Sequence, residues 1–156
     1  MNIKIGTKAP SISLPDQNNK IHKLSDYKGQ WVLIYFYPKD DTPGCTTEAC
    51  TLRDNFPKFK KIKAVILGIS TDSVASHKKF TDKYKLPFIL LADEDKKIVN
   101  KYGVWAEKSM YGRKYFGTIR SSFLVDPNGK IVRIYEKVKP AEHGIQVIND
   151  LKELQH

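Results

Sequence analysis

Cysteine is scarce in this sequence, and no apolar run is long enough to form a membrane segment. Only two cysteines occur in 156 residues, too few for a chain of this size to be a disulfide-stapled scaffold. The longest nearly unbroken apolar runs are 31–37 and 64–69, whereas a bilayer-spanning helix needs roughly 20 such residues. Residues 1–10 also lack the apolar core of an export signal. We therefore expect a cytoplasmic protein with no membrane partner and with thiols that are reduced at rest.

Internal repeats, low-complexity tracts and linkers rich in proline, glycine and serine are absent as well. A length of 156 residues is that of one ordinary domain with a substantial core. The sequence therefore predicts a single domain over residues 1–156.

Acidic residues are outnumbered by basic ones, which gives a formal net charge of +10. The lysines are nevertheless scattered along the chain, and their densest cluster, at 58–63, falls at the expected end of a helix. Cations at that end complement the helix dipole. We therefore expect solvated faces and no nucleic-acid partner. A basic module that binds nucleic acid stays open as the non-enzymatic alternative.

Strand and helix patterns alternate through the middle of the chain, which is typical of a parallel sheet core. The runs 31–37 and 64–69 are continuous, apolar and rich in β-forming residues, as buried strands are. The other expected elements are an N-terminal hairpin of 11–14 and 21–24, strands at 87–91, 119–125 and 130–135, and helices at 95–102 and 140–154. Residues 70–73 supply a helix cap, and a helix should run from there to about residue 84. Together they predict a thioredoxin-like α/β fold, with a central mixed β-sheet flanked by helices and an N-terminal β-hairpin.

A further helix is expected from residue 43 or 45 to about residue 59. Its apolar residues recur at spacings of three and four, at Ala49, Leu52, Phe56 and Phe59. Pro57 lies within this span and should kink or end the helix near Phe56.

Cys45 stands where the first buried strand leads through a loop into this helix. The free backbone N–H groups and dipole of a first helical turn stabilise an anion, and they lower the pKa of a cysteine placed there. Gly44 has no side chain to block a small substrate, and Thr42 offers a hydroxyl close to the sulfur. Thr42 could equally act only as the N-cap, and Cys45 could be an inert buried cysteine.

Cys50 favours redox chemistry over an inert role. On a continuous helix the two Cα atoms would lie about 8–9 Å apart, whereas a disulfide needs them within about 7 Å. The pair is thus a poor static staple and a plausible switch whose oxidation should melt the first turns of the helix. Zinc is not expected, because two thiols fall short of four ligands. The histidines do not supply the rest, since they are scattered at His22, His77, His143 and His156.

Two motifs resemble those of a known family. The spacing Pro38-x-x-x-Thr42-x-x-Cys45 is similar to the PxxxTxxC active-site motif of the peroxiredoxins. The run from Thr42 to Cys50 resembles the bacterioferritin comigratory protein (BCP/PrxQ) subfamily, in which a second cysteine follows five residues after the first. The resemblance extends over nearly the whole chain, including Gly6-x-x-Ala9-Pro10 and the segment 119–126.

The resemblance also implies roles for residues outside the loop. An arginine at the start of a strand like 119–125 contacts the thiolate in the family, and the matching residue is Arg120. Arg113 is a nearby competing candidate, although a solvated loop cation is the more ordinary role for it. Glu48 matches a family carboxylate and would hold Arg120 or a lysine. It could equally be a residue of the helix surface.

The family's reaction is thiol-dependent reduction of hydrogen peroxide and alkyl hydroperoxides. The resemblance implies that Cys45 is oxidised to a sulfenic acid, that Cys50 resolves it as a disulfide, and that thioredoxin or a glutaredoxin-like dithiol reduces the pair. Pro38, Gly44 and Glu48 would lie at the substrate, and no metal, flavin or haem would be needed. A monomer is expected because both thiols lie in one helix.

A thiol–disulfide oxidoreductase on the same fold is the nearest rival. Such enzymes usually carry C-x-x-C at the helix start, and this chain has C-x4-C instead.

Overall fold

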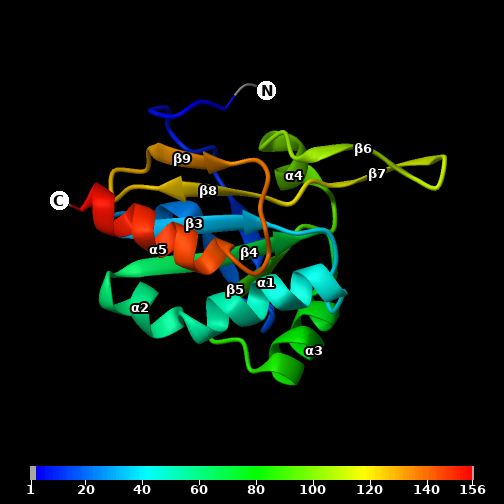
Figure 1. Cartoon of the computed structure of the whole chain (residues 1–156), viewed down its shortest axis with the longest axis horizontal. Coiled ribbons are helices and arrows are strands. Elements are labelled where there is room, and N and C mark those ends of the chain that lie inside the picture. The colour runs from blue at the N-terminus through cyan, green and yellow to red at the C-terminus, as the bar shows by residue number, and fades with distance from the viewer. Residues whose placement is uncertain (1–2, 156) are drawn as a thin grey trace.

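The computed structural model describes residues 3–155 and is built around a five-stranded mixed sheet in the order β5-β4-β3-β8-β9 (Figure 1). Strands β3, β4 and β5 run parallel, and β8 and β9 complete the sheet with antiparallel pairings. This arrangement confirms the predicted mixed sheet. Its strands are β3 (Trp31–Phe36), β4 (Ala64–Ser70), β5 (Ile89–Ala92), β8 (Ser121–Val125) and β9 (Ile131–Tyr135).

Side chains of β3 alternate between two apolar cores, one on each face of the sheet. Leu33 and Tyr35 belong to the core that includes Cys45, whereas Val32 and Ile34 belong to the other. Helices α1, α2, α3 and α5 contribute to the first core, and α4 with the segment before β1 contributes to the second. Both faces of β3 are therefore buried, which explains why its sequence is a continuous apolar run. The helices are α1 (Pro43–Asp54), α2 (Phe56–Lys61), α3 (Val74–Tyr84), α4 (Lys97–Lys101) and α5 (His143–Leu154).

The predicted break near Pro57 is confirmed, but it divides the expected helix into two. Helix α1 ends at Asp54, Asn55 lies between the helices, and α2 then begins with Phe56. Pro57 stands in the first turn of α2, where its missing N–H costs nothing. The helix predicted to follow a cap within 70–73 is also confirmed, and its N-cap is Ser73, whose hydroxyl accepts a hydrogen bond from the Ser76 N–H (3.1 Å).

The boundaries of other elements differ from the predicted ones by a few residues. The N-terminal hairpin is confirmed as β1 (Ser13–Pro15) and β2 (Ile21–Lys23), and the 3-10 helix η1 (Leu24–Tyr27) follows it. Strand β8 begins at Ser121 rather than 119, and α5 begins at His143 rather than 140. Helix α4 is shorter than the predicted 95–102.

A hairpin of β6 (Trp105–Met110) and β7 (Arg113–Thr118) was not predicted. It projects from the body of the protein (Figure 1), and most of its side chains are exposed, including Tyr111 at 99%. Without a buried face it shows no alternation of apolar and polar residues. Its turn has positive φ at Tyr111 and Gly112, a geometry usually marked by Asn-Gly or Asp-Gly. Among the helices of residues 3–155, none is long and apolar enough to cross a bilayer.

Candidate active site

Cys45 lies in the first turn of α1, immediately beyond the end of β3. Thr42 occupies the N-cap position with extended backbone, and Pro43 begins the helix. The Thr42 hydroxyl donates to the Lys39 carbonyl (2.8 Å), which closes the loop on itself. Because the helix begins so close to Cys45, the sulfur lies at the positive end of the α1 dipole. The loop thus places a thiol where an anion is favoured.

Arg120 reaches this sulfur from the other side of the site. It lies between β7 and β8, and its Nη2 is 3.2 Å from the Cys45 Sγ, while its Nη1 donates to Glu48 Oε1 (2.7 Å). Cys45 is only 2% exposed, so a thiolate there depends on this cation and on the helix terminus for stabilisation. The half-buried guanidinium therefore bridges the thiol and a carboxylate.

Gly44 allows Arg120 to approach so closely. A Cβ at position 44 would lie 3.0 Å from Arg120 Nη2, closer than ordinary van der Waals contact. The sequence suggested that Gly44 leaves room for substrate. The structure shows that the space of its missing side chain is taken by the guanidinium.

Glu48 is fully buried, which rules out the alternative that it is a residue of the helix surface. Burial raises the pKa of Glu48 to about 7, and the Arg120 charge and hydrogen bond oppose that rise only in part. The Glu48 Oε2 atom has no hydrogen-bond partner among residues 3–155, so nothing there compensates a charge on that oxygen. For Arg120 itself, burial opposes the charge, but the attraction of Cys45 and Glu48 prevails and raises its pKa. Ionising Glu48 in the folded protein is thus costly, although Arg120 holds the group in place.

This cost predicts a pH effect on folding. Between about pH 4.5 and 7 folded Glu48 retains a proton that the unfolded chain has lost, so the free energy of unfolding should fall as pH rises. The fall should amount to about 3 kcal/mol for a shift of this size. In Glu48→Gln that component should vanish, which urea denaturation at several pH values will measure. An unchanged pH slope relative to wild type would contradict the buried, proton-retaining carboxyl.

Cys50 is half-buried further along α1, and both thiols are free. The intervening residues are helical, so the structure shows the reduced form in which the two thiols are held apart. The C-terminal part of α1 packs against α5, where Gly144 lies close to Thr51 and Asn55. Cys50 must therefore leave a packed helix before it can reach Cys45.

Of the two remaining predicted residues, Pro38 lies near the site and Arg113 lies outside it. Pro38 is half-buried just after β3, in the loop that leads to Cys45. Arg113 is exposed at the start of β7, so Arg120 and not Arg113 is the arginine at the sulfur.

Lys108 of β6 was not predicted to lie near the site. Burial and then the Arg120 charge lower the pKa of this lysine, while Cys45 acts in the opposite direction, so Lys108 is near enough to sense both charges. It lies on the hairpin that was not predicted, and no sequence signal would have placed it there.

A second polar cluster lies behind the loop. Ligand atoms of Asp40, Asp72 and His77 are all within 4.8 Å of one another, a spacing that would suit a cation. The His77 nitrogens, however, are already hydrogen-bonded to Asp40 (2.7 Å) and to the Leu91 carbonyl (2.9 Å). Asp72 Oδ2 accepts bonds from the Asp40 N–H and from Ser70. A metal would have to break these hydrogen bonds, so we interpret the cluster as a hydrogen-bond network within the protein and not as a metal site.

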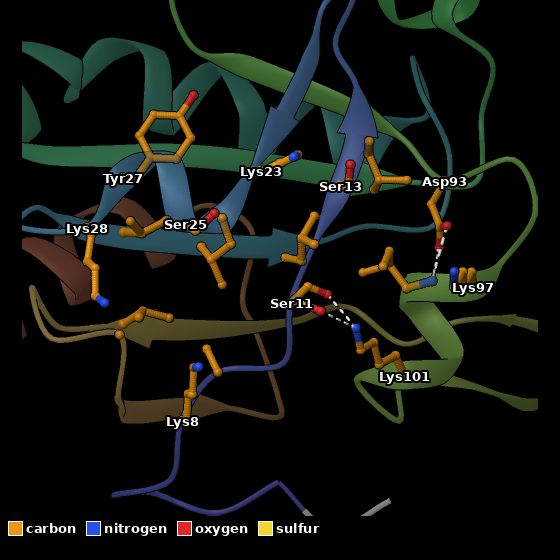
Figure 2. Close-up of a pocket in the computed structure, with 18 of the residues that line it drawn as sticks. Lys8, Ser11, Ser13, Lys23, Ser25, Tyr27, Lys28, Asp93, Lys97 and Lys101 are labelled. Carbon is orange, nitrogen blue, oxygen red and sulfur yellow. Dashed lines mark hydrogen bonds between the residues drawn. The ribbon is translucent and has the colours of Figure 1, made fainter.

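A large cavity, of about 970 Å³, lies on the other face of the sheet (Figure 2). It is lined by buried apolar residues such as Ile12 and Val32 and by lysines such as Lys8, Lys28 and Lys101. Neither cysteine nor Arg120 lines it. The cavity is therefore separate from the site around Cys45.

Comparison with known proteins agrees with this geometry. The family model described as the AhpC/TSA family matches residues 5–134. Peroxiredoxin Bcp of Bacillus subtilis is 45% identical over 154 residues, which cover 99% of this chain and 98% of that protein. The chain belongs to the peroxiredoxins of the AhpC/TSA family. Peroxiredoxin Bcp of Escherichia coli is 48% identical over 97% of each chain.

Solved structures place this peroxiredoxin in the BCP/PrxQ subfamily and confirm the predicted thioredoxin-like fold. The bacterioferritin comigratory protein of Xanthomonas campestris, studied for alkyl peroxide reduction, superposes with a TM-score of 0.88 at 40% identity, covering 93% of this chain and 92% of that one. PrxQ of Xylella fastidiosa gives a TM-score of 0.94 at 36% identity, covering 100% of this chain and 99% of that one. As a peroxiredoxin, the protein is a thiol-dependent peroxidase.

Proposed function

We propose that this peroxiredoxin reduces hydrogen peroxide and alkyl hydroperoxides through Cys45 and Cys50, with thioredoxin or a similar dithiol as reductant. The observation that carries the proposal is the Arg120 Nη2 at 3.2 Å from the Cys45 sulfur, which lies at a helix N-terminus. A cation and a dipole directed at one sulfur favour its ionised, reactive form. The same donors can also stabilise charge that develops on a peroxide oxygen.

In the first step the Cys45 thiolate attacks one oxygen of the peroxide. The S–O bond forms, the O–O bond breaks, and hydroxide or alkoxide leaves and takes a proton to become water or alcohol. The sulfur is oxidised by two electrons to a sulfenic acid. The Thr42 hydroxyl already donates to Lys39, so its lone pairs are free to accept a bond from the peroxide O–H. Pro38 and Gly44 shape the loop on which the peroxide would lie.

In the second step the Cys50 sulfur attacks the sulfenic acid. Water leaves and a Cys45–Cys50 disulfide forms, which requires α1 to open because a helix keeps the two cysteines too far apart. An external dithiol then attacks the disulfide, becomes oxidised itself and restores both thiols. The proposed cycle needs no bound metal or organic cofactor.

Other expectations remain part of the same proposal. Both thiols belong to one helix, so the disulfide can form within one chain and a monomer is sufficient. We also propose that residues 1–156 act as one domain and that the protein works in the cytoplasm, where a thioredoxin-type reductant is available.

The test is to compare wild type with Cys50→Ser in a coupled assay that follows peroxide loss and thioredoxin oxidation. Wild type should turn over continuously. Cys50→Ser should consume about one equivalent of peroxide and then stall, because its sulfenic acid cannot be resolved within the chain. Normal cycling by Cys50→Ser would show that Cys50 is not the resolving thiol. Disulfide reduction without peroxide loss in wild type would favour a thiol–disulfide oxidoreductase.

A further inference from the structure

The loop that precedes Cys45 is fastened to α3 by a buried group of polar side chains. Asp40 lies five residues before Cys45, and its carboxylate accepts hydrogen bonds from Tyr37 and from Ser76 of α3. The Nδ1 of His77, also on α3, lies 2.7 Å from the same carboxylate. Both partners are buried, with 0% of the His77 side chain and 4% of the Asp40 side chain exposed.

We propose that Asp40 and His77 form an internal ion pair that positions the Cys45 loop for reaction with peroxide. This inference deepens the proposed function and rests on it. His77 and Asp40 do not touch the sulfur, so they are positioning residues that act through the loop.

Hydrogen-bond geometry assigns the proton. His77 Nε2 lies 2.9 Å from the Leu91 carbonyl, which can only accept, so Nε2 carries a hydrogen. Asp40 already receives two hydroxyl donors, which favours its ionised form, and we therefore assign the hydrogen between Asp40 and Nδ1 to Nδ1. With both nitrogens protonated, His77 is an imidazolium in contact with a carboxylate.

The geometry also shows why this pair would affect the active site. The Asp40 N–H donates to Asp72 Oδ2 (2.8 Å), and the neighbouring Asp41 accepts bonds from Lys83 Nζ (2.7 Å) and the Tyr84 hydroxyl (2.8 Å). The Asp41 contacts are exposed and therefore weak, so the buried contacts of Asp40, with the His77 pair among them, are the main attachment of the loop. Thr42 follows two residues after Asp40, and a shift of about 1 Å in such a group can slow a reaction roughly 100-fold.

Three variants separate positioning from general stability. His77→Leu leaves a buried carboxylate without its counter-ion and should lower both the melting temperature and the rate of the Cys45–peroxide reaction, the latter roughly 10- to 100-fold. The double variant Asp40→Ala/His77→Leu buries no unpaired charge, so its melting temperature should recover. Its peroxide rate should stay low, because the attachment is still missing. His22→Leu is the matched control, since it breaks another His–Asp pair (2.6 Å) on the β1–β2 hairpin and should leave the peroxide rate unchanged.

Two outcomes would overturn the proposal. One is a double variant whose peroxide rate returns together with its stability, because the pair would then be merely structural. The other is a ¹⁵N NMR spectrum of wild type at pH 7 in which Nδ1 of His77 carries no proton. The NMR and melting measurements do not depend on activity. If wild type failed to consume peroxide, the proposed function would fall while these measurements still tested the ion pair.

Discussion

Replacing Cys45 by serine should reduce peroxide consumption to the level of the uncatalysed reaction. Serine is close in size to cysteine and can occupy the same buried position, so the fold should be retained. Its hydroxyl is a weak nucleophile unless a base activates it, and the group beside position 45 is the cation Arg120, which cannot accept a proton. The measurement is thioredoxin-coupled peroxide loss, with circular dichroism and thermal melting to verify folding.

The control for Cys45→Ser is Cys50→Ser, which removes the other thiol from the same helix. If the assignment is right, only the Cys50 variant retains a first turnover. Peroxide consumption at the wild-type rate by Cys45→Ser would contradict the assignment of Cys45 as the nucleophile. Loss of the first turnover in both variants, together with loss of folding, would instead indicate a structural role for the thiols. Melting curves distinguish this loss of folding from a loss of chemistry alone.

The burial of Cys45 makes its surroundings decisive. A sulfur that is 2% exposed and lined only by apolar groups would resist ionisation and would be inert. Here the sulfur contacts a guanidinium at 3.2 Å and lies at a helix N-terminus. The cysteine is therefore buried beside a stabilising cation and a helix terminus, which supports the proposed nucleophile over the inert core cysteine that the sequence alone left open.

Elements with strong local signals were predictable from the sequence. The β3 and β4 runs are apolar because both faces of these strands are covered, and Ser73 and Pro57 mark helix ends by their own chemistry. The β6–β7 hairpin escaped prediction because its exposed side chains follow no period. Secondary structure was thus predictable for elements whose burial imposes an apolar pattern on the sequence. It was unpredictable for the exposed hairpin, which has no such pattern.

The same distinction holds for the candidate site. Thr42, Cys45 and Cys50 lie within nine residues, so their relation could be read from local spacing. Arg120 was found only through resemblance, because it is 75 residues from Cys45. The Asp40–His77 pair spans 37 residues and had no motif to mark it. The burial of Glu48 depends on the packing of α1, which no single position reveals.

Arg120→Ala should slow the peroxide reaction of Cys45 about 10²- to 10³-fold, the range for loss of one well-placed donor to a developing charge. Its effect on thiol ionisation should be much smaller. An ordinary thiol with a pKa near 8.5 is roughly 3% ionised at pH 7. Lowering a thiol pKa to about 6 gains roughly 30-fold in thiolate but forfeits about 10- to 18-fold in nucleophilicity, if the Brønsted slope for disulfide exchange applies. Ionisation alone therefore explains only about a 2- to 3-fold gain.

Two comparison variants make the Arg120 measurement specific. Arg113→Ala removes an exposed arginine from the neighbouring strand β7 and should leave the rate unchanged. Arg120→Lys keeps the charge but loses the planar fork that now donates to the sulfur and to Glu48 at once, so it should recover only part of the rate. Rates come from stopped-flow peroxide reaction, and ionisation comes from the ultraviolet absorbance of the thiolate. If Arg120→Ala changes both by the same factor, Arg120 acts by ionising Cys45, and transition-state stabilisation by its guanidinium is refuted.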